Sequence, residues 1–213
     1  MLLVELQNIT KDYNEHVIFS NLSHTLRKGS CLIITGPNGS GKTTLLKIMA
    51  GLIRPASGKF IISIDGTLLS DEERKYYLGF VSPDLFLYEE LTALENLEFF
   101  VKVRGLADRE EYCIELLRKV QLEKWGRSLV GTYSTGMKQR LKFAYALLHQ
   151  PLLLLLDEPG ANLDEEGQAL VQEIISRQKE TGAVILSTND PGEVSRYGDQ
   201  VLKLDEAGGG FIK

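Results

Sequence analysis

A short glycine-rich segment carries the residues best suited to chemistry. Residues 36–43 read GPNGSGKT and fit the pattern G-x-x-x-x-G-K-[ST] of phosphate-binding loops. Its glycines let backbone N–H groups turn toward phosphate oxygens, and the helix expected after it offers its positive N-terminus to the same anion. We therefore predict that ATP binds to Gly36, Pro37, Asn38, Gly39, Ser40, Gly41, Lys42, Thr43 and Thr44.

Two side chains of this loop and an acidic pair further along the chain could bind and hydrolyse the nucleotide. We expect Lys42 to reach the β- and γ-phosphates and the Thr43 hydroxyl to ligate Mg²⁺. Asp157 and Glu158 follow an apolar run at residues 152–156, where a buried strand should end. Asp157 would hold Mg²⁺ through water, and Glu158 would orient or deprotonate the attacking water. Taken alone, such a pair is more often a helix cap or a turn.

The pattern around these residues predicts strands that alternate with helices. The apolar run at residues 31–35 predicts a strand, and a helix is expected over residues 42–50 with Gly51 as its stop. This order of strands and helices favours a buried parallel sheet. In the first third of the chain, apolar and polar residues alternate in part, which favours an antiparallel sheet there. The other predicted segments are strands at residues 2–6, 17–26, 59–64, 152–156 and 183–187, and a helix at 164–180 followed by Gly182.

Residues 88–150 have a helical pattern instead. Apolar residues recur there at the spacing of one helical face, first in one segment and then in another. We expect a helical subdomain inserted in the α/β core of a single domain over residues 1–213. The two apolar faces consist of Leu91, Leu94, Leu97 and Val101, and of Ile114, Leu117 and Val120.

The composition excludes several classes of protein. With a net charge of −5 and a pI near 5.4, the chain lacks the basic excess typical of nucleic-acid-binding proteins, so we expect no nucleic acid partner. Cys31 and Cys113 are too few for a disulfide framework, which favours the reducing cytosol. No signal peptide is apparent, and the most apolar region, residues 143–156, is shorter than the ~18 residues of a membrane span. Residues 208–210 are expected to form a flexible tail.

A second motif makes a family resemblance specific. Residues 133–140 read YSTGMKQR, which is similar to the LSGGQ signature of the ATP-binding subunits of ABC transporters, and the order of elements resembles that family over essentially the whole chain. Ser134 and Gly136 match the signature, whereas Thr135 and Met137 replace its first glycine and its glutamine. The resemblance implies that Ser134 and Gly136 cover the γ-phosphate of ATP bound to the opposite subunit. Without it, the segment would be interpreted as a helix N-cap.

The same resemblance assigns two further positions and exposes two departures. Tyr13 would stack on adenine, although a lone tyrosine at a strand end is usually a packing residue. Asp164 would cap its helix and also approach the partner subunit. Pro83 stands where the family carries a glutamine, so that either Asp84 substitutes for it by a small shift or the contact is absent, and Asn189 stands in place of the family's histidine. Asn189 can donate a hydrogen bond to a γ-phosphate oxygen but cannot carry a positive charge. Two hypotheses follow: the chain is a slow ATPase, or it is an active ATPase in which Glu158 carries most of the catalysis.

The resemblance also implies partners and a location. Two ABC subunits, as a homodimer or a heterodimer, would sandwich ATP and Mg²⁺ and drive an integral membrane permease that docks near residues 80–88 and the helical subdomain. The subunit would lie in the cytoplasm, on the inner face of the membrane. Export-type systems, such as the haem exporter of cytochrome c maturation or ABC-2 type exporters, are similar in size. A soluble nucleotide switch or scaffold with slow hydrolysis is the main alternative, and an unrelated P-loop kinase is another.

Overall fold

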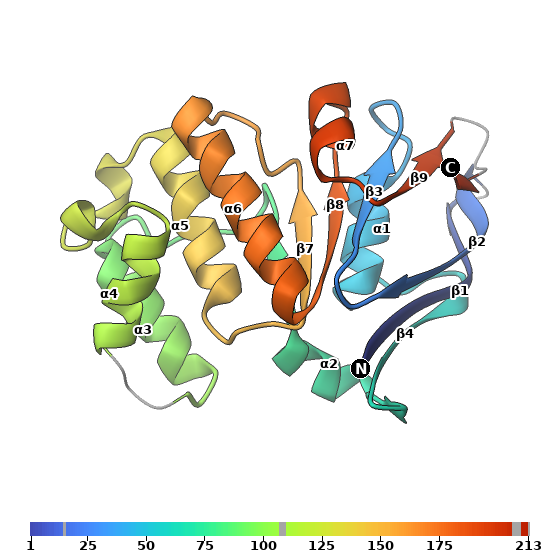
Figure 1. Cartoon of the computed structure of the whole chain (residues 1–213), viewed down its shortest axis with the longest axis horizontal. Helices are drawn as coiled ribbons and strands as arrows, with labels where there is room; N and C mark the ends of the chain where they lie inside the picture. Colours follow the sequence, from blue (N-terminus) through green and yellow to red (C-terminus); the bar gives the residue numbers. More distant parts are fainter. Residues whose placement is uncertain (15, 107–109, 206–209, 213) are drawn as a thin grey trace.

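Two β-sheets organise the chain (Figure 1). The computed structural model describes residues 1–14, 16–106, 110–205 and 210–212. One sheet has the strand order β10-β9-β3-β8-β7-β6, and its described neighbours are parallel except for β9 and β10. Its strands are β3 (Cys31–Thr35), β6 (Leu78–Val81), β7 (Leu153–Asp157), β8 (Ala183–Ser187), β9 (Gln200–Leu204) and β10 (Gly210–Ile212).

The second sheet is antiparallel and is formed mainly by the first third of the chain. Its strand order is β2-β1-β4-β5. The antiparallel sheet predicted for this region is therefore confirmed, although its first two strands extend further than predicted. The strands are β1 (Leu2–Tyr13), β2 (His16–Arg27), β4 (Ser57–Ile64) and β5 (Thr67–Leu68).

The helices fall into groups on either face of the parallel sheet. Helix α1 packs between the two sheets, while α3, α4 and α5, drawn in green and yellow, stand together at the opposite end of the molecule from the antiparallel sheet (Figure 1). The helices are α1 (Lys42–Met49), α2 (Asp71–Tyr77), α3 (Ala93–Val103), α4 (Glu110–Lys119), α5 (Thr135–Leu147), α6 (Glu165–Thr181) and α7 (Pro191–Tyr197), with short 3₁₀ turns at Glu123–Trp125 and Val130–Thr132.

Alternate residues of the central strands build two separate cores. Successive side chains of a strand point to opposite faces, so a fully apolar strand must be covered on both sides. In β3, Ile33 joins the core shared with α5 and α6, whereas Leu32 and Ile34 join the core shared with α1 and the antiparallel sheet. The fully buried strands β7 and β8 divide in the same way. This two-sided burial explains their unbroken apolar sequences.

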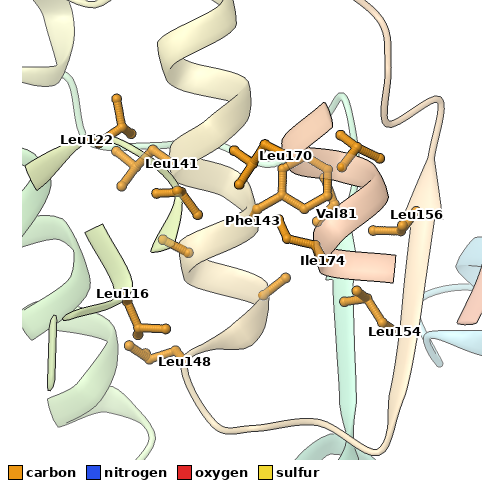
Figure 2. Packing of buried hydrophobic residues seen from close by; sticks show 14 of the residues in the cluster. Val81, Leu116, Leu122, Leu141, Phe143, Leu148, Leu154, Leu156, Leu170 and Ile174 are labelled. Carbon is orange, nitrogen blue, oxygen red and sulfur yellow. The ribbon is translucent and has the colours of Figure 1, made fainter. Parts of the chain in front are cut away.

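The first of these cores attaches the helical region to the sheet. Phe143 of α5 is fully buried, and Figure 2 shows it close to Leu170 and Ile174 of α6, with Val81 of β6 nearby. Helix α5 therefore touches both the strand that precedes the helical region and the long helix that follows it. The carboxyl ends of β6 and β7 are held in place from this side.

The observed elements confirm most of the sequence predictions and correct some. Strands β3 and β8 have the predicted bounds, and Asp164 is the N-cap of α6 with its carboxylate accepting from the backbone N–H of Gly167 at 2.8 Å. The prediction of a tail at residues 208–210 is wrong for Gly210, which begins β10 and pairs with Leu204. Residues 208 and 209 lie outside the described residues. The division of the chain into a core and an inserted subdomain stays a prediction.

We predict that Phe143→Ala lowers the free energy of unfolding by about 3–5 kcal/mol, because it leaves a cavity between α5, α6 and the sheet. Phe86→Ala is the matched control, since Phe86 is 89% exposed. The control should change the free energy of unfolding by no more than about 0.5 kcal/mol. Urea unfolding followed by circular dichroism measures both variants, and equal losses would contradict this account of the core.

Candidate nucleotide-binding site

The phosphate loop runs from the end of β3 to the start of α1. Gly36, Gly39 and Gly41 all have positive φ angles, so the loop follows a backbone path that residues with side chains rarely adopt. A Cβ atom on Gly41 would lie only 2.4 Å from the Ile18 side chain of β2. The loop is therefore packed directly against the antiparallel sheet, and at this position only glycine fits.

Lys42 is held at the mouth of the loop. Its ammonium donates hydrogen bonds to the carbonyl oxygens of Gly36 at 2.8 Å and Pro37 at 3.1 Å. Burial lowers the pKa of Lys42 from its ordinary value, and the negative charges of Glu158 and Asp157 oppose this shift. A cation in this environment is well placed to exchange carbonyl partners for the oxygens of an anionic ligand.

Asp157 joins the loop to the ends of two other strands. Its carboxylate accepts a hydrogen bond from the Thr43 hydroxyl at 2.8 Å and another from the Ser187 hydroxyl. Asp157 is only 1% exposed, so these donors compensate for the burial of its charge. The two residues predicted to hold Mg²⁺ are therefore in direct contact. Ser187, which the sequence analysis missed, lies opposite Asp157 in the β7–β8 pairing.

Glu158 follows Asp157 but faces a different environment. Its side chain is exposed, and its backbone has a φ of 48°, which is uncommon for a residue other than glycine. Its N–H donates to the carbonyl of Ser187 at 3.0 Å, which fixes this strained turn at the end of β7. Since no metal-site hydroxyl binds its carboxylate among the described contacts, Glu158 is available to act on water.

Asn189 is tied to the phosphate loop. Its side-chain amide donates a hydrogen bond to the Asn38 side-chain oxygen at 2.6 Å. Asn38 and Asn189 are both exposed, and the neighbouring Thr188 N–H donates to the carbonyl of Ile34 in β3. The segment after β8 thus meets the loop, as the prediction for Asn189 requires.

A phosphate group with Mg²⁺ fits these residues. The Ser40 hydroxyl is buried and has no hydrogen-bond partner among the described residues, so a phosphate oxygen could supply one. No cluster of three or more His, Cys, Asp or Glu residues in the described chain could hold a metal by itself. Mg²⁺ usually takes one or two protein oxygens and completes its shell with phosphate oxygens and water, and the adjoining Thr43 and Asp157 side chains offer such oxygens.

Ser134, Gly136 and Asp164 form a second cluster at the starts of α5 and α6. Ser134 is the N-cap of α5, and its hydroxyl accepts from the N–H of Met137 at 3.2 Å. Arg140 donates to the Asp164 carboxylate at 3.0 Å and so links the two helices. A hollow of about 570 Å³ is bordered by Ser134, Gly136, Met137, Arg140 and Asp164. The hollow presents a helix N-terminus, which favours anions.

Tyr13 lies at the end of β1 and is 47% exposed. The Lys11 ammonium lies 4.4 Å from the centre of its ring, and Tyr13 pairs with His16 of β2. Since Ile18 of the same strand contacts Gly41, the hairpin that carries Tyr13 adjoins the phosphate loop. Stacking of Tyr13 on adenine stays a prediction.

Comparison with known proteins places the chain in a family. The ABC transporter family matches residues 19–161, which include the phosphate loop, the YSTGMKQR segment and the Asp157–Glu158 pair. The chain belongs to the ABC transporter family. In this ABC protein, the loop, Asp157 and Asn189 meet at one edge of the parallel sheet, and Ser134 and Gly136 lie together at the start of α5. The predicted family resemblance is confirmed.

Several bacterial ABC proteins are similar to most of the chain. The linearmycin resistance ATP-binding protein LnrL of Bacillus subtilis is 34% identical over 88% of this chain, which covers 61% of that protein. The lantibiotic transport ATP-binding protein SrtF of Streptococcus pyogenes is 33% identical over 92% of this chain and 84% of its own length. The Nod factor export ATP-binding protein I of Cupriavidus metallidurans is 32% identical over 95% of this chain and 68% of its own.

Solved ABC cassettes share the fold. An ATP-binding subunit of an ABC transporter has a TM-score of 0.85 and 30% identity, and the match covers 99% of this chain and 89% of that one. A dimeric ATP-binding cassette in a post-hydrolysis state, bound to ADP and Pi, has a TM-score of 0.84 and 29% identity, and the match covers 99% of this chain and 97% of that one. The predicted α/β fold of a P-loop NTPase is therefore confirmed.

Alanine substitutions in the loop separate steric contact from backbone strain. Gly39→Ala and Gly41→Ala both place a side chain at a positive φ, but only the new Cβ at position 41 meets other atoms. We predict that Gly39→Ala costs about 1–2 kcal/mol of folding stability and that Gly41→Ala costs about 1–3 kcal/mol more. Urea unfolding without nucleotide measures both, and equal costs would show that the loop does not pack on β2 as described.

Proposed function

We propose that the chain is the ATP-binding and ATP-hydrolysing subunit of an ABC transporter, and that ATP drives the closing of a dimer of such subunits on a membrane partner. The observation that carries this proposal is the contact between Thr43 and Asp157 beside Lys42. It places a hydroxyl, a carboxylate and an ammonium at one loop, as a Mg²⁺–triphosphate group requires.

On the nucleotide side, each residue has a separate task. The loop N–H groups and Lys42 bind the phosphates, and Tyr13 stacks on the base. Thr43 and Asp157 hold the metal, with Asp157 acting through water. Bound Mg²⁺ neutralises the charge that develops on the phosphate oxygens. Glu158 orients or deprotonates the attacking water, because its carboxylate is not engaged by the metal-site hydroxyls.

The second cluster serves the ATP bound to the opposite subunit. Ser134 and Gly136 border an open hollow at the start of α5, and Asp164 borders the same hollow from α6. The Ser134 hydroxyl and the first N–H groups of α5 would bind the γ-phosphate across a homodimer or heterodimer interface. These contacts exist only in the closed dimer, so ATP shifts the population toward it. The post-hydrolysis dimer among the similar structures supports this arrangement.

An integral membrane permease is the proposed partner. None of the described helices is long and apolar enough to cross a membrane. A hollow of about 710 Å³ lies between the segment after β6 and helices α3 and α5, and Phe86, Tyr88 and Phe100 contribute aromatic surface to it. A cytoplasmic segment of the permease would dock there, which places the subunit on the inner face of the membrane. The relative named as a Nod factor export protein supports an exporter, and SrtF is named as a lantibiotic transport protein.

We predict that Glu158→Gln retains ATP binding and lowers kcat by about 10²–10⁴-fold, because it removes the general base. Lys42→Ala should instead weaken ATP binding by about tenfold or more, because it removes a charged hydrogen-bond donor. Fluorescent-nucleotide titration measures binding, and phosphate release measures turnover. Glu173→Gln on α6 is the control carboxylate. Wild-type turnover in the Glu158→Gln variant would contradict the proposed role.

Substitution of Asn189 tests whether ATP turnover by this chain is intrinsically slow. A neutral amide makes weaker hydrogen bonds to phosphate than a charged imidazole, so Asn189→His should raise kcat by about tenfold in the presence of the membrane partner. Rapid hydrolysis by the wild-type complex, with no gain from Asn189→His, would show that Glu158 alone suffices.

Isolation of the tagged chain from solubilised membranes tests the partner. The transporter proposal expects an integral membrane protein to copurify in a fixed ratio, and Phe86→Asp should abolish this association by replacing part of the aromatic surface of the hollow with a charge. The soluble switch is the alternative candidate, and it expects the chain to remain in the soluble fraction. The neutral Asn189 side chain favours that alternative, because a switch tolerates slow hydrolysis.

A further inference from the structure

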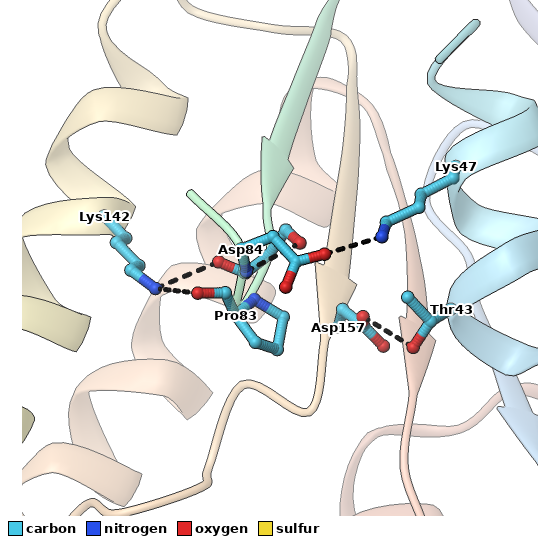
Figure 3. Close-up of polar contacts among 7 residues, drawn as sticks. Thr43, Lys47, Pro83, Asp84, Lys142 and Asp157 are labelled. Carbon is cyan, nitrogen blue, oxygen red and sulfur yellow. Dashed lines mark hydrogen bonds and ion pairs between the residues drawn. The ribbon is translucent and has the colours of Figure 1, made fainter. Parts of the chain in front are cut away.

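The segment that follows β6 is held by two lysines from two different helices (Figure 3). We call Ser82, Pro83 and Asp84 the bridge segment. The Lys142 ammonium on α5 donates hydrogen bonds to the carbonyl oxygens of Ser82 at 3.1 Å and Pro83 at 2.7 Å. On the other side, the Lys47 ammonium on α1 donates to the Asp84 carboxylate at 2.6 Å. Helices α1 and α5 are thus connected through three consecutive residues.

The local backbone explains why the bridge segment contacts both Lys47 of α1 and Lys142 of α5. Pro83 fixes its own φ and has no N–H to donate, so its carbonyl is its only backbone hydrogen-bonding group. The N–H of Asp84 donates back to the Ser82 hydroxyl at 3.3 Å, which folds the segment into a tight turn. In Figure 3 the two carbonyls point toward Lys142 and the Asp84 carboxylate points toward Lys47.

The charges around Asp84 favour its ionised form. The hydrogen bond from Lys47 and its positive charge hold the pKa of Asp84 below the ordinary value, and Lys142 adds a smaller effect. Burial lowers the pKa of Lys142, and the charge of Asp84 opposes that shift. The Asp84 carboxylate therefore lies in the field of two cations, one from each helix.

Both helices begin at a phosphate-binding feature. Lys47 is four residues after Thr43, so the two side chains lie one turn apart on the same face of α1. Thr43 in turn contacts Asp157. Helix α5 starts at its N-cap Ser134. The bridge segment consequently links the helix that binds one ATP to the helix proposed to bind the ATP of the opposite subunit.

We propose that Asp84 is a positioning residue for ATP hydrolysis, which acts by fixing Lys47 and α1 relative to α5 through the bridge segment. This inference rests on the proposed function. Among the described hydrogen bonds and ion pairs, those of Asp84 go to Lys47 and Ser82 and not to Thr43, Asp157 or the phosphate loop, so we assign it to the alignment of the two site-bearing helices. Loss of its charge leaves nucleotide binding intact and slows the step that needs both helices in place.

A merely structural surface ion pair is the competing explanation. The Asp84 side chain is 69% exposed, and exposed pairs contribute little to folding stability. Such a pair would alter the unfolding midpoint slightly and leave kcat unchanged. A positioning residue would alter kcat while the affinity for nucleotide stays constant.

The test compares Asp84→Asn, Lys47→Met, the double variant and Asp84→Glu in this chain, with phosphate release and nucleotide binding measured in parallel. We expect Asp84→Asn and Lys47→Met each to lower kcat by about three- to fivefold, with the nucleotide Kd within about twofold of wild type. The double variant should be no slower than either single variant, because both remove the same interaction. Asp84→Glu, which keeps the charge, should restore most of the rate.

Salt dependence and a control pair complete the experiment. In 1 M salt, where charges are screened within ~3 Å, wild type and Asp84→Asn should approach the same kcat. Glu123→Gln removes a comparable exposed pair with Arg118, which is not part of the bridge segment, and should leave kcat unchanged. A wild-type rate in Asp84→Asn, or additive losses in the double variant, would overturn the inference. If instead wild type hydrolyses ATP no faster than Glu158→Gln, the proposed function itself fails.

Discussion

The hydrogen bond from the Thr43 hydroxyl to the Asp157 carboxylate is the contact on which the candidate site depends. Thr43 lies in the helix that follows β3, and Asp157 ends β7, with β8 between the two strands. Since parallel strands end at the same edge of the sheet, this strand order also brings Ser187 and Asn189 to that edge. The two cores on the faces of the sheet keep the strands in register, and the register keeps the site assembled.

The local features of the site could be predicted from the sequence, whereas its lateral contacts could not. The phosphate loop, strand β3 and the Asp164 cap depend on patterns within a few residues. The Lys47–Asp84 pair joins residues 37 positions apart, and no local pattern determines which charges meet over such a separation. Helix α2 was missed because none of its residues is buried, so it has no apolar stripe. The tail prediction failed at Gly210 because pairing with β9 outweighed its glycine-rich composition.

The proposed residue roles separate nucleotide binding from nucleotide turnover. In that proposal, the loop, Lys42 and the Thr43–Asp157 pair of one subunit bind the nucleotide. The proposed turnover additionally needs Glu158, and in the proposed dimer it needs Ser134 from the opposite subunit. Ser134 already caps α5 by accepting from Met137, so one side chain can stabilise its helix and orient the N-terminus toward a phosphate. The cap and the signature interpretations of this segment are therefore compatible.

Calorimetric titration of ATP with and without Mg²⁺, on wild type and on Asp157→Asn, tests the central claim most directly. Asn at position 157 keeps an oxygen that can accept from Thr43 but loses the charge that attracts the metal. We expect Mg²⁺ to increase the ATP affinity of wild type and this increase to fall by about tenfold or more in Asp157→Asn, while ATP binding in EDTA stays the same. An equal Mg²⁺ effect in both proteins would contradict the assignment of Asp157 to the metal.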